Sequence, residues 1–157
     1  MIFLTVGSQL PFERLVRVVD EWAAVNNQKV QAQIGKSQYQ PKYIKGVDFI
    51  QPRQYDKLFK KARVVIAHAG TGVIMNALEL QKPIIVMPRQ EKFLEHRNDH
   101  QMATAIRFKE LLGVYVAMNE EELGNWLGKI NELKGGYKIQ PYASGKILEA
   151  ITELINA

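Results

Sequence analysis

Polar and glycine residues gather in two short stretches of the sequence, residues 68–72 and 97–101. The first reads His-Ala-Gly-Thr-Gly and the second Arg-Asn-Asp-His-Gln. Each stretch comes after an apolar run of strand length and before a helical pattern, so each is expected to open a helix. Because helix N-termini carry unpaired N–H groups and partial positive charge, two of them at one end of a sheet favour a phosphorylated ligand.

The first stretch has the residue types of a phosphate-binding turn. Gly70 and Gly72 let a ligand approach the backbone closely, and Thr71 adds a hydroxyl group where the helix N–H groups are free. In the helix that follows, Gly72, Asn76 and Glu79 share one polar stripe. This stripe suits ribose hydroxyls, although exposure to solvent is the simpler interpretation for Glu79.

The second stretch has two interpretations that can hold together. Asn98 with Gln101 forms a variant of the capping box, which would stabilise a helix by about 1 kcal/mol and need no further role. However, Arg97, Asp99, His100 and Gln101 offer more polar groups than a cap requires. Their donors and acceptors suit sugar hydroxyls, so we expect ligand contact here.

Two familiar nucleotide-binding signatures are incomplete in this chain. Residues 35–37, Gly-Lys-Ser, resemble the end of a P-loop, but Val30 stands where its first glycine is required. Gly70 and Gly72 match two glycines of the dinucleotide fingerprint, but Met75 occupies the third position. The sequence therefore predicts neither a P-loop nor a nicotinamide site.

Metal and thiol chemistry are not expected. His96 and His100 have the i, i+4 spacing of two zinc ligands on one helix face, but Arg97 and Asp99 stand where the zinc-protease patterns require glutamate, and no third ligand is evident. A small zinc hydrolase is therefore a remote alternative. The chain has no cysteine, which removes disulfides and thiol nucleophiles.

Composition indicates an ordinary globular domain. The 157 residues are 46% hydrophobic and carry a formal net charge of +5. The one dense basic cluster, residues 57–63, has no interleaved aromatic platform, so no nucleic acid is expected. No stretch approaches the roughly 20 apolar residues of a membrane span, and the first residues lack a basic signal-peptide region. We expect a cytoplasmic protein that meets the membrane only through a partner.

Apolar runs alternate with helical patterns along the chain. The predicted strands cover residues 2–6, 29–34, 47–50, 64–67, 83–87 and 114–117, and the predicted fourth helix covers residues 98–112 with Met102, Ile106 and Leu111 inward. Strands that alternate with helices form parallel sheets with right-handed crossovers. The predicted fold class is therefore α/β, a Rossmann-like doubly wound parallel sheet, over residues 1–143.

The tail, residues 144–157, differs in character. Ser144 is a suitable cap for a last helix that has many apolar residues, namely Ile147, Leu148, Ile151, Leu154 and Ile155. Two interpretations remain open: packing against the core, and docking of a partner.

The combined motifs resemble a known family. Residues 68–72, the strand at 84–87, and residues 95–101, Glu-His-Arg-Asn-Asp-His-Gln, resemble the nucleotide-sugar half of glycosyltransferase family 28. With residues 3–9 and 11–16, the chain is similar to the small catalytic subunits of split bacterial exopolysaccharide glycosyltransferases. It is also similar to the catalytic subunit of the dolichyl-linked UDP-N-acetylglucosamine transferase. The resemblance covers nearly the whole chain.

The resemblance implies the donor-binding half of a GT-B glycosyltransferase. It implies an inverting, metal-independent transferase without cofactor that moves a sugar from a UDP-sugar to a lipid-linked acceptor. A second, membrane-anchored subunit would hold that acceptor at the inner face of the membrane. A non-catalytic nucleotide-sugar-binding or scaffold subunit is the alternative.

The resemblance also implies residue roles. Gly70, Thr71 and Gly72 would contact the diphosphate, with Gly7 and Ser8 at the neighbouring strand end. Helix N-termini there would stabilise charge on the departing diphosphate.

The remaining roles concern the ribose, the sugar and the general base. Asn76 falls where a relative in cell-wall synthesis has a ribose-binding glutamate, and His100 and Gln101 fall where it has two glutamines near the sugar. His68, Asp99 and His100 are candidates for the general base, which the partner could equally supply.

Overall fold

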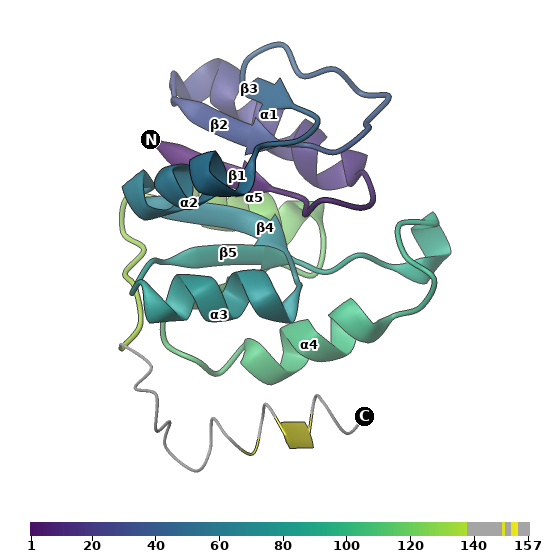
Figure 1. The fold of residues 1–157 in the computed structure, drawn as a ribbon, viewed down its shortest axis with the longest axis vertical. Helices are drawn as coiled ribbons and strands as arrows, with labels where there is room; N and C mark the ends of the chain where they lie inside the picture. The colour runs from purple at the N-terminus through teal and green to yellow at the C-terminus, as the bar shows by residue number, and fades with distance from the viewer. Residues whose placement is uncertain (138–148, 150–151, 154–157) are drawn as a thin grey trace.

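Six short parallel strands form one sheet at the centre of the molecule (Figure 1). The structure is a computed structural model, and it describes residues 1–137, 149 and 152–153. The strand order is β3-β2-β1-β4-β5-β6, so the order reverses between β1 and β4. The strands are β1 (Ile2–Thr5), β2 (Val30–Gln33), β3 (Lys45–Val47), β4 (Val64–His68), β5 (Ile84–Met87) and β6 (Val114–Val116).

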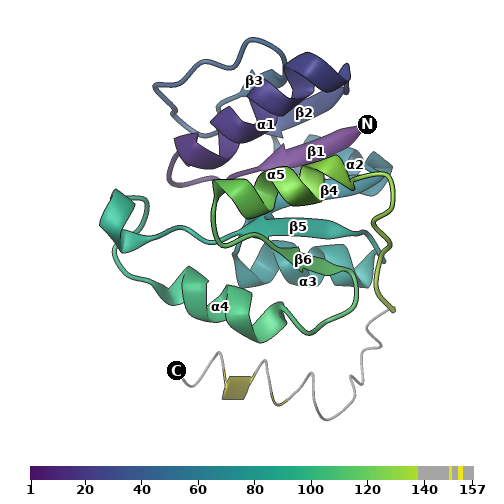
Figure 2. The same cartoon turned by 180° about the vertical axis from the view of Figure 1, so that it is seen from behind.

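Helices cover both faces of the sheet. One face carries α1 (Glu13–Asn26) and α5 (Glu120–Gly128), and the other carries α2 (Pro52–Lys61), α3 (Thr71–Glu79) and α4 (His100–Phe108) (Figures 1 and 2). This is the predicted Rossmann-like α/β architecture, and the parallel sheet is confirmed. A short 3-10 helix, η1 (Glu91–Phe93), lies in the long connection between β5 and α4.

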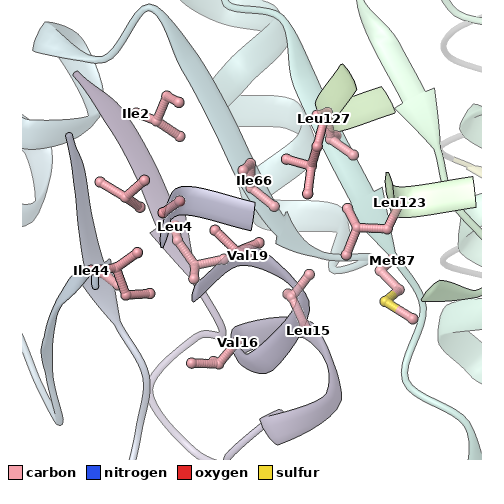
Figure 3. Packing of buried hydrophobic residues seen from close by; sticks show 14 of the residues in the cluster. Ile2, Leu4, Leu15, Val16, Val19, Ile44, Ile66, Met87, Leu123 and Leu127 are labelled. Atoms are coloured by element: carbon pink, nitrogen blue, oxygen red, sulfur yellow. The ribbon is translucent and has the colours of Figure 1, made fainter. Parts of the chain in front are cut away.

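Burial on both faces explains the apolar strands. Ile2 and Leu4 of β1 point towards α1 and α5, where they pack with residues such as Leu15 and Leu127 (Figure 3). Phe3 points to the opposite face and lies edge-on against Phe59 of α2, with 6.0 Å between the ring centroids. Strands buried on both faces are continuous apolar runs, as in this sequence.

The third strand begins and ends earlier than predicted. We expected residues 47–50, whereas β3 covers Lys45–Val47. The reason is a side chain: the N–H of Ile50 donates to Oε1 of the buried Gln33 at 2.8 Å, so residue 50 pairs with an amide group and not with the neighbouring strand.

The fourth helix is shorter than predicted, and its capping box does not form. The helix begins at His100, not at Asn98, and Asn98 Oδ1 accepts from the His100 N–H at 3.0 Å. Gln101 does not return to the helix start, because its Oε1 accepts from the N–H of Arg89 at 3.1 Å. Gln101 therefore joins the first turn of α4 to the residues that directly follow β5.

The inward face of the fourth helix also differs from the prediction. Ala105 and Phe108 are the buried apolar residues of α4, while Ile106 is 61% exposed. Met102 and Leu111 are partly buried. Packing of Phe108 and Ala105 on the sheet turns Ile106 outward, because neighbouring helix positions cannot share one face.

The predicted helix over 144–157 lies outside the described residues, except for Glu149, Thr152 and Glu153. Glu153 forms an ion pair with Arg107 of α4. Within the described residues, no helix is both long and apolar enough to cross a membrane.

A buried carboxylate organises the connection between β2 and β3. Asp20 of α1 is 1% exposed and accepts from the backbone N–H groups of Lys42, Tyr43 and Ile44 at 2.8–3.0 Å, and from the Tyr39 hydroxyl at 2.7 Å. Burial alone would raise the pKa of Asp20, but these hydrogen bonds outweigh burial and lower the pKa below its ordinary value.

We expect Asp20→Ala to lower the free energy of unfolding by about 2–4 kcal/mol, because three backbone donors lose a charged acceptor. The stabilisation is present above the ordinary carboxyl pKa and is lost as the pH falls through the lowered folded-state pKa. Urea denaturation at several pH values measures both effects. Glu21→Ala, an exposed neighbour on α1, should change stability by less than about 0.5 kcal/mol. Equal losses in the two variants would contradict this role.

Candidate functional site

Three adjoining hollows lie at the carboxyl ends of β1 and β4, where the strand order reverses. The central hollow, about 230 Å³, is lined by Val6, Gly7, Ser8, Gln9, Leu10, His68, Arg89, His96 and Gln101. The helix-start hollow, about 400 Å³, is lined by Ala69, Gly70, Thr71, His96, His100, Gln101, Ala103, Thr104 and Arg107. The aromatic hollow, about 330 Å³, is lined by Gly7, Ser8, Gln33, Phe49, Ile50, Pro52, Tyr55 and Asp56.

Shared residues make the three hollows one cleft. His96 and Gln101 line both the central and the helix-start hollow, while Gly7 and Ser8 line both the central and the aromatic hollow. In open α/β sheets, ligands bind outside the carboxyl ends of the strands at the point where the strand order reverses. The cleft therefore lies where this fold binds ligands.

The helix-start hollow unites the two predicted helix starts. Thr71 opens α3 and His100 opens α4, and both line this hollow. No side chain in the described part of the protein caps α3, so its first N–H groups are available to an anion. By contrast, α5 is capped by Asn119, whose Oδ1 accepts from the N–H of Glu122 at 2.9 Å.

The imidazole of His68 lies between two glycines. Gly7 has a φ of +81°, and a Cβ atom there would lie 3.1 Å from Cε1 of His68. A Cβ atom on Gly70 would lie only 2.5 Å from Nε2 of the same ring. The ring thus fills the space that side chains at positions 7 and 70 would need. The two glycines serve packing as well as backbone approach.

Burial keeps His68 neutral. It lowers the pKa of His68 to about 4, and the positive charge of Arg89 acts in the same direction, as does His96 to a smaller extent. The carbonyl group of Thr5 opposes this shift. At neutral pH the ring is therefore an uncharged donor and acceptor in a positive environment.

Arg89 connects the two loops that line the central hollow. It is 3% exposed, and Nη2 donates to the carbonyl groups of Val6 and Leu10, each at 2.6 Å. The guanidinium group lies over the ring of Phe12, 5.2 Å from its centroid. These contacts fix both ends of the loop that carries Gly7 and Ser8. Burial lowers the pKa of Arg89 to about 10, which leaves it charged at neutral pH.

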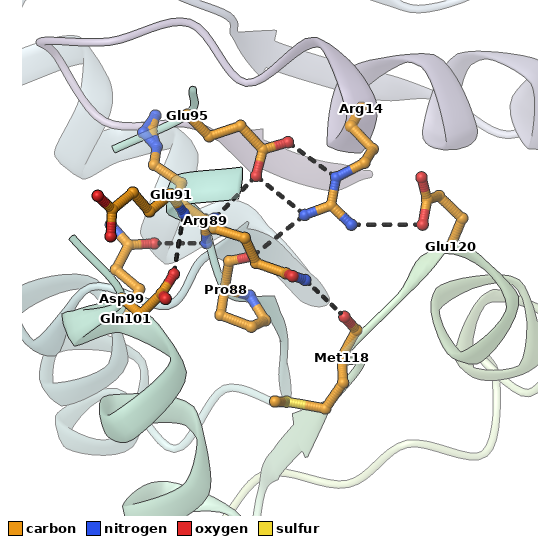
Figure 4. A network of polar contacts seen from close by, with 10 residues as sticks. Arg14, Pro88, Arg89, Glu91, Glu95, Asp99, Gln101, Met118 and Glu120 are labelled. Atoms are coloured by element: carbon orange, nitrogen blue, oxygen red, sulfur yellow. Dashed lines mark hydrogen bonds and ion pairs between the residues drawn. The ribbon is translucent and has the colours of Figure 1, made fainter. Parts of the chain in front are cut away.

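An ion pair fixes the connection between β5 and α4 onto α1 (Figure 4). Arg14 binds Glu95 through two contacts, Nε to Oε1 at 2.8 Å and Nη2 to Oε2 at 2.9 Å. Glu95 Oε2 also accepts from the N–H of Gln90 at 2.9 Å, and Arg14 reaches Glu120 of α5 at 3.3 Å. Bidentate pairs of this kind define orientation as well as proximity.

Gln33 fixes the opposite side of the cleft. Its Nε2 donates to the carbonyl group of Gly7 at 2.9 Å, while its Oε1 accepts from Ile50. One buried amide group thus joins the loop after β1 to the segment that carries Phe49, a lining residue of the aromatic hollow.

The structure brings most of the predicted site residues together. The cleft is lined by Gly7, Ser8, His68, Gly70, Thr71, His100 and Gln101. Gly72 is exposed on the first turn of α3, and a Cβ atom added there would meet nothing within 4 Å. Asn76 is one turn further along and is not among the residues that line the three hollows. Asp99 accepts from the Glu91 N–H at 2.8 Å and so holds η1.

Sequence reasoning missed Arg89, Gln33 and the pair of Arg14 with Glu95. A signal existed for Arg89, because a cation follows Pro88 directly at the end of a buried apolar strand. Gln33 is the last residue of β2 and is equally unusual as a buried amide group. The pair of Arg14 with Glu95 joins residues 81 apart in the chain, and no local pattern indicates it.

The two spaced histidines do not share a helix face. His96 precedes α4, whereas His100 is its first residue, so the spacing expected of a helical zinc pair is not formed. In residues 1–137, 149 and 152–153, no group of three His, Cys, Asp or Glu side chains is placed to hold a metal ion. Both histidines instead line the helix-start hollow.

The fold and the cleft define a Rossmann-like ligand-binding domain. The glycosyltransferase family 28 C-terminal domain matches residues 1–140, and the chain belongs to this family. The resemblance inferred from the motifs is therefore confirmed. A search of curated protein sequences finds no match.

Solved structures share the fold. The solution structure of ALG13 superposes with a TM-score of 0.60 at 20% identity, covering 96% of this chain and 93% of that one. The glycotransferase of kitacinnamycin (TM-score 0.59, 18% identity) and MurG of Acinetobacter baumannii (0.57, 17%) match over 99% and 83% of this chain. This chain spans only 39% and 40% of those two proteins, respectively.

We expect Gly70→Ala to destabilise the protein by about 1–3 kcal/mol, because its Cβ would displace the confined ring of His68. Gly72→Ala is the matched control, since a Cβ there meets nothing within 4 Å and alanine favours the helix. Chemical denaturation measures both variants. A Gly70→Ala protein as stable as Gly72→Ala would show that the ring has free space.

We also expect the His68 ring to titrate with a midpoint near pH 4, as followed by NMR of its Cε1–H group. Between about pH 4 and 6.5, the unfolded chain binds more protons at this residue than the folded chain does, so stability rises with pH. The effect is on the order of 3 kcal/mol over that range, and His68→Gln should remove it. A midpoint near 6.5 would contradict the buried, neutral state.

Proposed function

We propose that this chain is the donor-binding, catalytic subunit of an inverting glycosyltransferase. It would move a sugar from a UDP-sugar to a lipid-linked acceptor in exopolysaccharide or capsule synthesis. The observation that carries this proposal is the uncapped start of α3 at the point where the strand order reverses, with the ring of His68 between Gly70 and Gly7. Family membership supplies the reaction class.

The diphosphate would lie at the start of α3. There it would accept hydrogen bonds from the first N–H groups of α3, near the Thr71 hydroxyl, and from the loop at Gly7 and Ser8. The partial positive charge of the helix start would stabilise the negative charge that develops as the bond between the sugar C1 and the diphosphate oxygen breaks.

The sugar would lie beside Gln101, which lines both the helix-start and the central hollow. Gln101 Oε1 is already bonded to Arg89, which leaves the amide NH₂ group of Gln101 to donate to a sugar hydroxyl. The acceptor hydroxyl would attack C1 from the opposite face and pass its proton to a base. A pKa near 4 makes His68 a weak base. Asp99 accepts from the Glu91 N–H and lines none of the three hollows, so His100, which lines the helix-start hollow, or a partner residue suits this role better.

The acceptor would be held by a membrane-anchored partner, as the family resemblance implies. The chain would then work at the inner face of the membrane while remaining peripheral to it. We propose residues 144–157 as the docking element. Deletion of these residues should abolish co-purification with the partner and leave the domain folded.

We expect UDP and a UDP-sugar to raise the free energy of unfolding, by about 2.7 kcal/mol at a ligand concentration of 100 Kd. Thr71→Val and Gln101→Ala should weaken this effect, whereas Gln54→Ala, an exposed residue of α2, should not. Thermal unfolding with and without nucleotide measures the shift. Unchanged unfolding in the presence of every UDP compound would contradict donor binding.

Catalysis needs a separate test from binding. In the complex reconstituted with its partner, Thr71→Ala combined with Gln101→Ala should lower sugar transfer at least about tenfold. Full activity would favour a scaffold role for this chain.

A further inference from the structure

Three buried side-chain nitrogens in the described part of the chain make no hydrogen bond. They are Nδ1 of His68, Nε of Arg89 and Nδ1 of His96. All three residues line the central hollow. Buried polar atoms are nearly always paired, so three unpaired atoms around one hollow indicate a polar ligand.

The central hollow is positively charged. Arg89 is 3% exposed and forms no ion pair with any described residue. The acid that most affects it, Glu95, is already paired with Arg14 and with the N–H of Gln90. Among the described residues, no acidic side chain lines this hollow. A buried charge without a counter-ion is costly, so the hollow favours an anionic group.

Size and position narrow the choice of ligand. The volume of about 230 Å³ equals roughly seven or eight waters, which suits one sugar ring and not a nucleotide. The central hollow shares His96 and Gln101 with the helix-start hollow, where the diphosphate is proposed to bind. The group attached to the diphosphate would therefore reach the central hollow.

We propose that the central hollow binds a carboxylate on the transferred sugar, so that the donor is a UDP-linked uronic acid. This inference rests on the proposed function. Nη2 of Arg89 already donates to Val6 and Leu10, so its unpaired Nε is the guanidinium donor for a carboxylate oxygen. The rings of His68 and His96 can each donate an N–H as well. A neutral sugar would leave the charge of Arg89 without a counter-ion.

Calorimetric titration of the 157-residue chain with UDP, UDP-glucose and UDP-glucuronate tests this inference. We expect UDP-glucuronate to bind at least about tenfold more tightly than UDP-glucose. Equal affinities, with UDP itself bound, would overturn the carboxylate site and leave the proposed function standing. No binding of any UDP compound would overturn both.

A carboxylate could also belong to the acceptor, so methyl glucuronide is titrated in the presence of UDP. Its binding, together with equal affinities for the two UDP-sugars, would place the carboxylate on the acceptor and overturn the donor assignment.

Substitutions in the central hollow test whether the carboxylate binds there. Arg89→Gln and His96→Gln should each lower the preference for UDP-glucuronate severalfold while UDP still binds. Arg89 also fixes the loop after β1, so His96→Gln, which leaves those loop contacts intact, keeps the test valid if Arg89→Gln does not fold. Lys92→Gln, an exposed cation of the same connection, is the control and should retain the preference. A preference that survives both Arg89→Gln and His96→Gln would overturn the assignment.

Discussion

The buried guanidinium group of Arg89 is the contact on which the cleft depends. Its two hydrogen bonds hold the carbonyl groups of Val6 and Leu10, while its backbone N–H reaches Gln101. The loop after β1 and the connection between β5 and α4 are distant in sequence, and this one residue joins them. The bidentate pair of Arg14 and Glu95 then holds the same connection against α1. These contacts attach both loops to the sheet and to α1.

The same charge shapes the chemistry of the cleft. It acts with burial to keep His68 neutral, while the lack of side chains at Gly7 and Gly70 provides the space that the ring occupies. The uncapped start of α3 adds partial positive charge in the neighbouring hollow. The cleft of this family 28 domain therefore combines hydrogen-bond donors with positive potential.

Local patterns in the sequence predicted the fold, because the apolar residues of each run or helical stripe are the ones that the sheet and helices bury. The predicted limits of β3 and α4 were wrong because side-chain contacts determine where these elements begin and end. Gln33 accepts a hydrogen bond from the Ile50 N–H, and Gln101 accepts one from the Arg89 N–H. Glycine and threonine at residues 70–72 predicted the position of the cleft. The pair of Arg14 and Glu95 was not predictable, since the two residues meet only once the sheet has formed.

NMR titration of the backbone amides with UDP tests donor binding at the start of α3 most directly. We expect the largest chemical-shift changes at Ser8, Gly70, Thr71 and Gly72. A separate hollow of about 270 Å³ beside β6 and α5, lined in part by Val116 and Trp126, serves as an internal comparison. Largest changes around Trp126, or no changes at residues 70–72, would contradict donor binding at the start of α3.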